Sequence, residues 1–522
     1  MKKTLLILSL FTTTLFSQQL NFFTQTNYRG AFEPSPTPMW SDGWVNWDPQ
    51  NTVYPIHTDI VSSNITTNTI WSSNKTYLVQ GPIYVSSELT IQPGTIILFD
   101  KTTAGSALII TKTGKLFADG TQTQPIVFTS NAVPGQRNIG DWGGIVILGK
   151  AVNNLPANAA SGTPAGVGFI EGLPTSTNTE YGGNDDSDNS GILRYIRIEF
   201  GGYAYQPDKE INGITFGSVG SNTIVDYIQV SFTNDDAFEW FGGTVNAKHL
   251  VSYRNLDDDM DCDFGYRGKV QFVLIVRDPF IADQSSGSTS EGFECDNDGA
   301  GSNNGPKTAA TFSNVTAIGP LRGNIQSTID PKHQRALRLR RNSEMKIFNS
   351  VFTDFKRGLH IDGASTEANA QLGTLKFRYN TIAGCYEKYM IPSPNNFNIK
   401  SWYLGNSNDT LTSTTNLLVS PYNYLQPDYR PNTNSVLLNG ASFSDTELGS
   451  QNIGVDEFTS NSIFYPNPVY DVANFPTDGI IMDLNGRFVM NVKKGENFLT
   501  SLVDGVYIYQ NKLGFNTKLI KK

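Results

Sequence analysis

The sequence reads Asp235-Asp236-Ala237-Phe238-Glu239-Trp240-Phe241-Gly242 and, 23 residues later, Asp258-Asp259-Met260-Asp261-Cys262-Asp263-Phe264-Gly265. The two aspartates and the closing Phe-Gly pair coincide at this offset, and further on Leu250-Val251 falls on Val273-Leu274. Self-similarity at a fixed period is typical of repeat folds, in which each unit buries its apolar face against the next. We therefore interpret this stretch as two consecutive units of a repeat.

The repeat extends in both directions. At the same offset of 23, Tyr227–Val230 falls on Leu250–Tyr253. Upstream, Tyr195–Phe200 resembles Tyr227–Phe232 at an offset of 32, which is one period plus an insertion near residues 203–208. Later units are recognisable at Met345–Phe352 and Leu375–Ile382.

The unit consists of short β-branched and aromatic runs, such as Thr95–Phe99 and Pro125–Phe128, with turn residues every eight to twelve positions. This texture predicts an all-β fold. A propeller blade needs about 40 residues, and the consensus of leucine-rich repeats is absent. We predict a right-handed parallel β-helix over residues 75–400, whose coils stack about 4.8 Å apart so that equivalent positions form ladders.

The chain begins with Lys2 and Lys3, an apolar run Leu5–Phe11 and small or polar residues up to Ser17. This pattern indicates a signal peptide over residues 1–18. Because a membrane span needs about 20 apolar residues and the run breaks at Thr12, we expect an exported protein with no transmembrane segment.

Two further segments flank the repeats. Residues 19–74 carry Trp40, Trp44, Trp47 and Trp71, and we expect them to cap the open end of the β-helix, as repeat folds require; an aromatic ligand platform is the alternative. Residues 401–460 are rich in Asn, Ser, Thr and Pro, which indicates the end of the β-helix and a linker.

Residues 461–522 contain three motifs in order, Tyr465-Pro466-Asn467-Pro468, Met482-Asp483-Leu484-Asn485-Gly486-Arg487 and Gly505-Val506-Tyr507-Ile508-Tyr509, followed by the closing Thr517–Lys522. They resemble the C-terminal sorting domain of type IX secretion cargo from Bacteroidetes, although the first hairpin, near residues 472–476, is abridged. The resemblance implies a small C-terminal β-sandwich, the translocon and sortase of that system as partners, and a protein released or attached to the outer-membrane surface after the domain is removed. A small adhesive β-sandwich is the alternative.

The central region resembles secreted Bacteroidetes β-helix proteins of pectin-lyase-like type. The segments that carry the resemblance are Asp141–Gly149, Arg194–Gly202 and Asp236–Asn246. The activity of that group is unsettled, so the resemblance implies the fold and the compartment only.

Charge and cysteine content exclude some classes of protein. A net charge of −9 argues against binding to nucleic acid, whose phosphates require a basic surface. Cys262, Cys295 and Cys385 lack the spacing of a metal site, and three cysteines cannot form a disulfide framework. A Cys262–Cys295 bridge is conceivable in an oxidising compartment.

The densest functional candidate is an acidic ladder on successive units, where stacking would bring Asp236 about 5 Å from Asp259. Three interpretations remain open: Ca²⁺ coordination, a carboxylate pair acting on a glycosidic bond, and turn formation through backbone N–H groups. The candidate Ca²⁺ ligands are Asp235, Asp236, Glu239, Asp258, Asp259, Asp261, Asp263, Glu291 and Glu294. An acidic loop at residues 184–191 has calcium-binding character but lacks the glutamate of an EF-hand.

The catalytic set is incomplete. The candidates are Asp236, Asp259, Arg338 and His333, and the Gly-His-Gly and Arg-x-Lys patterns of β-helix pectinases are missing. Arginines at 335, 338, 340 and 341 can grip an anion, act as the base of an elimination, or pair with acidic neighbours. His249 aligns with Phe272, which indicates a structural role.

Together these features predict a secreted or surface-exposed β-helix that binds an extracellular ligand such as a glycan, with Ca²⁺ assistance. The alternatives are a polysaccharide lyase or glycoside hydrolase, and a partner of an outer-membrane transport, gliding or adhesion complex.

Overall fold

The computed structural model describes residues 22–206, 209–323, 328–391, 397–449, 472–475, 478–483, 488–511 and 516–521. The chain forms two compact units, residues 1–450 and 451–522. The signal peptide at 1–18 and the motif Tyr465-Pro466-Asn467-Pro468 lie outside the described residues.

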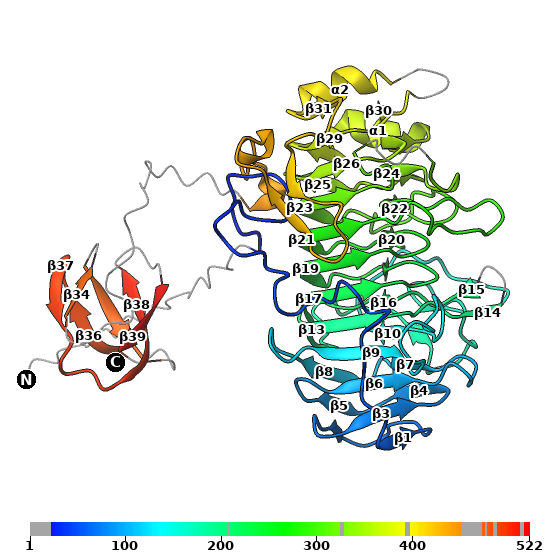
Figure 1. The fold of residues 1–522 in the computed structure, drawn as a ribbon, viewed down its shortest axis with the longest axis horizontal. Helices are drawn as coiled ribbons and strands as arrows, with labels where there is room; N and C mark the ends of the chain where they lie inside the picture. Colours follow the sequence, from blue (N-terminus) through cyan, green and yellow to red (C-terminus); the bar gives the residue numbers. More distant parts are fainter. Residues whose placement is uncertain are drawn as a thin grey trace, which may run out of the picture. The chain divides into compact units, whose positions relative to one another are not determined.

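The first unit is a parallel β-helix (Figure 1). One of its faces is a sheet of ten parallel strands, which we call the front sheet. In spatial order it contains β4 (Pro82–Val85), β7 (Ala107–Ile110), β10 (Ile145–Leu148), β16 (Ile214–Gly217), β18 (Phe238–Phe241), β20 (Met260–Asp263), β22 (Phe293–Cys295), β24 (Arg335–Arg340), β27 (Arg357–Asp362) and β30 (Glu387–Tyr389).

The remaining faces of each coil belong to a second parallel sheet. Its early strands are β1 (Asp59–Val61), β2 (Thr69–Trp71), β3 (Thr76–Val79), β5 (Glu88–Ile91), β6 (Ile96–Phe99), β8 (Lys115–Asp119) and β9 (Ile126–Ser130). Five long strands follow: β13 (Gly191–Glu199), β17 (Ile224–Ser231), β19 (Asn246–Tyr253), β21 (Lys269–Val276) and β23 (Thr311–Ile318). The last are β25 (Lys346–Phe348), β26 (Val351–Thr353), β28 (Lys376–Arg378), β29 (Thr381–Ala383) and β31 (Asp409–Leu411). The stack thus begins one coil before residue 75.

Each long strand turns a corner at one residue with positive φ, an uncommon conformation for a side chain other than glycine. These corner residues are Tyr195, Tyr227, His249, Phe272 and Asn314, with φ between 49° and 62°. The four rings stack along the helix axis at centroid separations of 4.3, 4.1 and 5.1 Å. His249 therefore has the structural role that its alignment with Phe272 predicts.

The register corrects the predicted stacking of the aspartates. Strand β17 pairs with β19 and β18 with β20 at an offset of 22, whereas β19 pairs with β21 at 23. Asp236 consequently lies beside Asp258, whose backbone N–H donates to Asp236 Oδ1 at 2.9 Å. A slip of one residue reverses the face of a strand residue, so the expected contact between Asp236 and Asp259 is wrong. The insertion predicted near 203–208 is the hairpin of β14 (Ala204–Gln206) and β15 (Lys209–Glu210).

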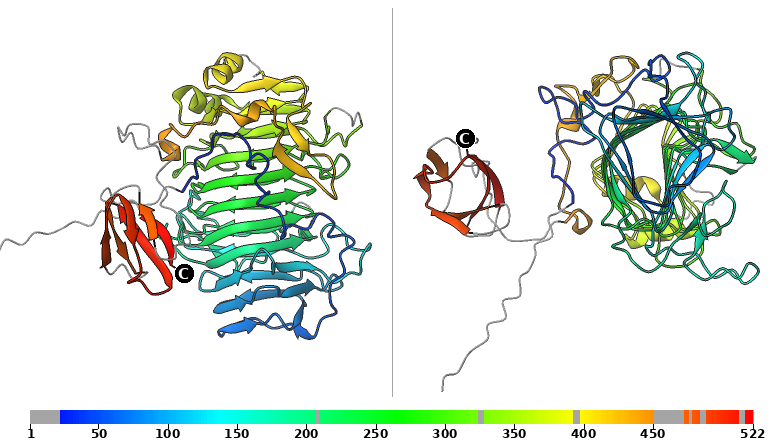
Figure 2. Two further views of the ribbon diagram at one scale, coloured as in Figure 1. Left: turned by 60° about the vertical axis from the view of Figure 1, so that its left-hand side comes forward. Right: turned by 90° about the horizontal axis from the view of Figure 1, so that it is seen from below.

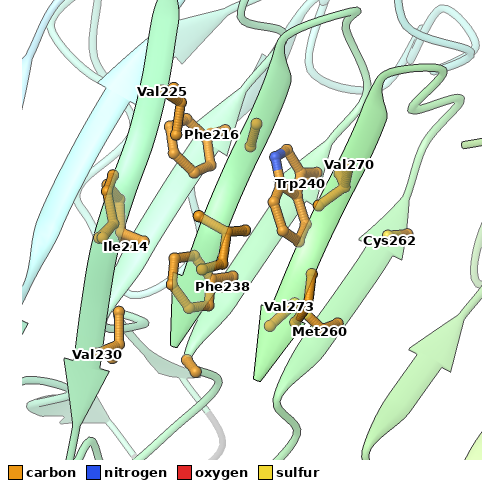
Figure 3. Close-up of a cluster of buried hydrophobic side chains, with 14 of the residues drawn as sticks. Ile214, Phe216, Val225, Val230, Phe238, Trp240, Met260, Cys262, Val270 and Val273 are labelled. Carbon is orange, nitrogen blue, oxygen red and sulfur yellow. The ribbon is translucent and has the colours of Figure 1, made fainter. Parts of the chain in front are cut away.

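Apolar side chains fill the interior of the coils (Figure 3). In the front sheet Phe238 and Trp240 point inward, and their register partners Met260 and Cys262 lie beside them on the next coil. Cys262 is paired in register with Cys295, and both are buried free thiols.

We predicted that the tryptophan-rich N-terminal segment caps the open end of the β-helix, and this prediction is wrong. The segment runs along the side of the β-helix instead (Figures 1 and 2). Trp44 packs against Tyr195 and Tyr227 and is 1% exposed. Its cluster includes Val251 and Leu274 from the outer face of the second sheet. That face is apolar and needs a cover, which is why the segment lies there; Trp71 instead belongs to the first coil's core.

The C-terminal part of this unit also differs from a simple linker. Helix α1 (Ala364–Leu372) precedes α2 (Ile399–Gly405), whose Tyr403 joins the end of the interior core. Residues 412–449 then pack on the same lateral cluster as the N-terminal segment, through Tyr429 and Leu437. Their elements are β32 (Leu418–Ser420), β33 (Asp428–Pro431) and the 3₁₀ turns η1 (Val436–Leu438) and η2 (Thr446–Leu448).

The second unit is antiparallel. Strand β34 (Val472–Phe475) pairs with β37 (Gly495–Phe498), and a four-stranded sheet contains β36 (Phe488–Val492), β35 (Gly479–Met482), β38 (Gly505–Asn511) and β39 (Asn516–Lys521) in that order. Side chains of both sheets share one apolar cluster. Gly505 begins β38, and Tyr507 is buried in the cluster. None of the helices in the described ranges is long and apolar enough to span a membrane.

Candidate functional site

A polar cleft of about 410 Å³ opens on the outer surface of the front sheet, over strands β18 to β24. Nine carboxyl groups and three guanidinium groups line it, together with the hydroxyl-rich loop of residues 285–289. The charged residues of the lining are Glu171, Asp235, Asp236, Glu239, Asp257, Asp258, Asp261, Asp283, Glu294, Arg338, Arg340 and Arg341.

The centre of the cleft is a column of side chains that alternate with the inward core residues. Glu239 pairs in register with Asp261, Asp261 with Glu294, and Glu294 with Arg338. Neighbouring strands in a sheet lie about 4.8 Å apart. The fold therefore places three carboxylates in line and follows them with a guanidinium.

A second column lies at the corner that precedes the front sheet. Asp236 Oδ1 accepts the backbone N–H of Asp258, Asp258 Oδ1 accepts that of Glu291 at 2.5 Å, and Glu291 Oε2 accepts that of Arg335 at 2.6 Å. The turn-forming interpretation of the acidic ladder is thus confirmed for one oxygen of each of these three carboxylates.

Several carboxylate oxygens in the cleft lie close enough to share one ion. Three sets have ligand atoms within 4.8 Å of one another: Asp235 with Asp236 and Asp257, Asp236 with Glu239 and Asp261, and Asp258 with Asp261 and Glu294. Asp236 and Asp261 each belong to two sets. They are therefore the central candidates for ligands.

Burial and mutual repulsion make these carboxyl groups hard to ionise. Desolvation, followed by the charge of neighbouring carboxylates, raises the pKa of Asp236, Glu239, Asp258 and Asp261 well above the usual range. Asp257 behaves in the same way, and its Oδ1 is buried without a hydrogen-bond partner among the described residues. Either protons or a cation must offset the charge that gathers here.

The arginines at the other end of the cleft are already paired. Arg338 contacts Glu294 at 3.2 Å and Asp362 at 3.0 Å. Arg340 pairs with Glu294 and Asp296, and Arg341 with Asp296. Of the three roles considered for these arginines, pairing with acidic neighbours is the one that the structure confirms.

Two of the four catalytic candidates lie away from the cleft lining. Asp259 is fully buried and pairs with the equally buried Arg277 at 2.7 Å; desolvation outweighs this partner and raises its pKa to about 6. His333 is 1% exposed, its Nε2–H donates a hydrogen bond to the carbonyl of Asp278, and burial lowers its pKa to about 3. Asp236 and Arg338, the other two candidates, share the cleft.

Asp259 is also a candidate Ca²⁺ ligand, and two further candidate ligands are separated from the cleft. Asp263 points outward next to its register partner Phe241 and accepts the N–H of Phe264, but it does not line the cavity. Glu291 is fully buried and pairs with Arg335. Each already has a partner within the chain.

The acidic loop at 184–191 uses its carboxylates for its own fold. Asp185 accepts the N–H of Ser187, Asp186 pairs with Arg267, and Asp188 accepts from Ser190. The clusters of carboxylates that could hold an ion, among the residues described, all lie in the cleft.

Sequence reasoning missed part of the cleft wall. Glu171, Asp283 and the loop 285–289 line it, and Lys332 Nζ holds this loop by donating to the carbonyls of Ser285 and Ser288. The signal was available in the spacing, because β20 and β22 pair at an offset of 33 rather than 22. The extra residues form the part of the wall that contains Asp283 and the loop 285–289, whereas Glu171 comes from the segment between β11 (Gly168–Phe169) and β12 (Glu180–Tyr181).

The fold and the cleft define a parallel β-helix with a polar site on one outer sheet. Residues 63–415 match the family described as pectate-lyase-like β-helix domain, and the chain belongs to this family. Among solved structures it is similar to the crystal structure of the Dettilon tailspike protein, with 10% identity and a TM-score of 0.20 over 67% of this chain and 61% of that chain. The chain thus spans about 61% of the tailspike's length. No curated protein gives a significant match.

Proposed function

We propose that this protein binds an extracellular glycan, and that Ca²⁺ held by the acidic cleft assists the binding. The observation that carries the proposal is the cluster of Asp236, Glu239 and Asp261, whose oxygens lie within 4.8 Å of one another. No ion pair of these three residues occurs within the described part of the chain.

The donor set fits Ca²⁺. This ion takes six to eight oxygen ligands at 2.3–2.6 Å, so two oxygens that share it lie at most about 5 Å apart. Asp236 and Asp261 each belong to two of the three carboxylate sets and could serve as ligands in either one. Asp257 would contribute its Oδ1, which has no hydrogen-bond partner among the described residues. Bound Ca²⁺ would supply open coordination positions for sugar oxygens.

The walls of the cleft suit a polar polymer. Ser285, Ser288 and Thr289 donate their hydroxyl protons to carboxylates of the chain, and their oxygens can accept from sugar hydroxyls. Without a cation, the excess of carboxylates repels an anionic sugar. Glycan binding should therefore depend on the divalent ion.

Calorimetric titration of the chelated full chain with CaCl₂ tests the ion site directly. We expect saturable binding that Asp261→Asn and Asp236→Asn each weaken by more than about tenfold. Asp119→Asn is the matched control, because Asp119 is an exposed strand residue whose side chain pairs with Arg194 at the surface. Equal affinities in the control and the two cleft variants would refute the site.

A polysaccharide panel, screened with Ca²⁺ and with EDTA, tests the ligand class. Binding that EDTA abolishes and Asp261→Asn reduces is the expected result. If Ca²⁺ binds but the panel gives neither binding nor turnover, the glycan part of the proposal fails while the ion site stands.

A glycoside hydrolase is the second candidate. Glu239 and Asp261 are carboxyls with raised pKa values in one cleft, and a general acid needs such a pKa to carry its proton near neutral pH. A lyase is less favoured, since Arg338 is held by Glu294 and Asp362 and so is poorly placed to act as a base. Release of reducing ends by the wild type but not by Asp261→Asn would favour the hydrolase.

We also propose export by the type IX secretion system, with the protein secreted or attached to the outer-membrane surface. The resemblance of residues 461–522 to its sorting domain supports this route, as does the position of Gly505–Tyr509 in a strand of a separate unit. Deleting residues 461–522 should retain the protein inside the outer membrane. Unchanged export of the truncated chain, measured by cell fractionation, would contradict the route.

A further inference from the structure

A second cavity, of about 530 Å³, adjoins the acidic cleft, and Glu171 lines both. Its volume falls within the roughly 300–1,000 Å³ typical of small-molecule sites. In contrast to the cleft, its wall is largely apolar and aromatic: Leu155, Val167, Phe169, Tyr181, Phe241 and Phe264.

The floor of this aromatic cavity is built by the register of the front sheet. Phe241 lies two residues beyond Glu239 on β18, so both side chains point outward. The Tyr181 ring lies over Gly217, where an added Cβ would come within 2.9 Å of it. Tyr181 and Phe241 stack at 5.9 Å, and Phe264 follows Phe241 at 5.6 Å.

The exposed fractions of the aromatic side chains distinguish the floor of the cavity from the rings that a ligand can contact. Tyr181 and Phe241 are 2% and 6% exposed, whereas Phe169 and Phe264 are partly exposed. Polar groups stand at the rim, on Asn158, Ser161 and Thr163. Glu171 is the one charged residue of the described lining.

We propose that the aromatic cavity is a subsite for an uncharged pyranose ring of the same glycan whose neighbouring part occupies the acidic cleft. One face of a pyranose carries C–H groups with partial positive charge, which suits the negative face of an aromatic ring. Its hydroxyl groups reach outward, toward the rim residues. An anionic sugar would meet only the like charge of Glu171 in the described lining.

Continuity with the cleft decides for a sugar over an isolated apolar ligand. Because Glu171 belongs to both linings, and Glu239 and Phe241 are neighbours on one strand face, a chain of sugars can occupy both cavities at once. This inference rests on the proposed glycan binding and adds a chemical class to it.

Saturation-transfer NMR of the full chain with neutral hexasaccharides of glucose, xylose, mannose and galactose tests the subsite. We expect transfer to the ring C–H protons of at least one of them. Phe169→Ala should weaken binding by between about twofold and tenfold, and Phe169→Trp should retain it. Phe280→Ala is the control, since Phe280 is 65% exposed and lines neither cavity.

The outcomes separate the two proposals. Neutral sugars that bind the wild type and Phe169→Ala equally, or that bind neither, overturn the aromatic subsite. The subsite is also overturned if both Phe169→Trp and Phe169→Ala lose binding while their thermal midpoints stay unchanged. A stacking subsite should accept the indole ring in place of the phenyl ring. Ca²⁺ titration of the same samples reports on the cleft independently, so an ion site without a sugar subsite, or the reverse, is recognised.

Discussion

Two aspartates close together in the chain, one just before strand β20 and one within it, allow a test in which the same substitution has opposite effects. Asp259 precedes β20 and Asp261 lies within it, and burial raises the pKa of both. Asp259 faces Arg277 at 2.7 Å, with both side chains 0% exposed. Asp261 is surrounded by the carboxyls of Glu294 and its other acidic neighbours.

Asp259→Asn leaves the Arg277 guanidinium buried without its counter-ion. Such a change costs about 3–5 kcal/mol, and we expect the lower part of that range, because Arg277 also donates to the carbonyls of Asn255 and Glu291. With an unfolding entropy of about 2.1 cal/mol/K per residue over the roughly 430 residues of the β-helical unit, the thermal midpoint should fall by about 3–4 °C.

Asp261→Asn should have the reverse effect in EDTA. A carboxyl whose folded pKa is raised gives full stability below its unfolded pKa of about 3.9 and loses it as pH rises through the folded value. Removing Asp261 removes that loss, so the midpoint near pH 8 should rise, whereas near pH 4 it should match the wild type. Millimolar Ca²⁺ should stabilise the wild type and Asp259→Asn by similar amounts, and Asp261→Asn by less.

Circular dichroism melting at one scan rate, with EDTA or Ca²⁺ and at both pH values, measures all of these shifts. The reasoning is refuted if Asp261→Asn lowers the midpoint near pH 8 in EDTA as much as Asp259→Asn does. It is also refuted if Ca²⁺ stabilises both variants equally.

Three further predictions address the cleft, the side cover and the aromatic cavity. Ca²⁺ affinity should increase from about pH 5 to pH 8 and binding should release protons, because the raised pKa values of Asp236, Glu239 and Asp258 let protons compete with the ion. Calorimetry in buffers of different ionisation enthalpy measures the number of protons released, and pH-independent binding would contradict the prediction. Trp44→Ala, at a side chain 1% exposed, should cost about 3–5 kcal/mol, whereas the exposed Phe280→Ala should stay within about 0.5 kcal/mol in denaturant melts. Gly217→Ala should push the Tyr181 ring away and reduce neutral-sugar binding without changing Ca²⁺ affinity, since its Cβ would lie 2.9 Å from that ring.

The repeat in the sequence is sufficient to predict the β-helix but not its exact register. Strand β18 is followed by four turn residues, 242–245, whereas β20 is followed by five, 264–268. The extra residue comes after Asp263. An alignment that correctly matches Leu250 with Val273 is therefore wrong by one residue for the positions before this turn. In that alignment Asp259 takes an outward-facing position, whereas in the structure it pairs with the buried Arg277.

The lateral position of the N-terminal segment left a trace in the sequence that the prediction did not use. Seven of the eight residues of β21, Lys269–Val276, are buried, because both faces of this strand are covered. A strand exposed on one face alternates, whereas one buried on both faces reads as a continuous apolar run. The run Phe272–Val276 thus indicated that another segment covers the outer face of this strand. Which segment does so depends on contacts between residues that are far apart in the sequence.

Stacked coils bring equivalent carboxylates close together, so each acidic column needs compensation. The corner column obtains it from backbone N–H groups of the next coil, and Glu294 obtains it from Arg338 and Arg340. The position shared by Glu239 and Asp261 has no cationic side chain paired to it within the described residues. The acids of the neighbouring coils are thus neutralised within the chain, whereas Glu239 and Asp261 must take up protons or an external cation. This uncompensated negative charge, more than the number of acidic residues, is our reason for proposing the Ca²⁺ site between β18 and β20.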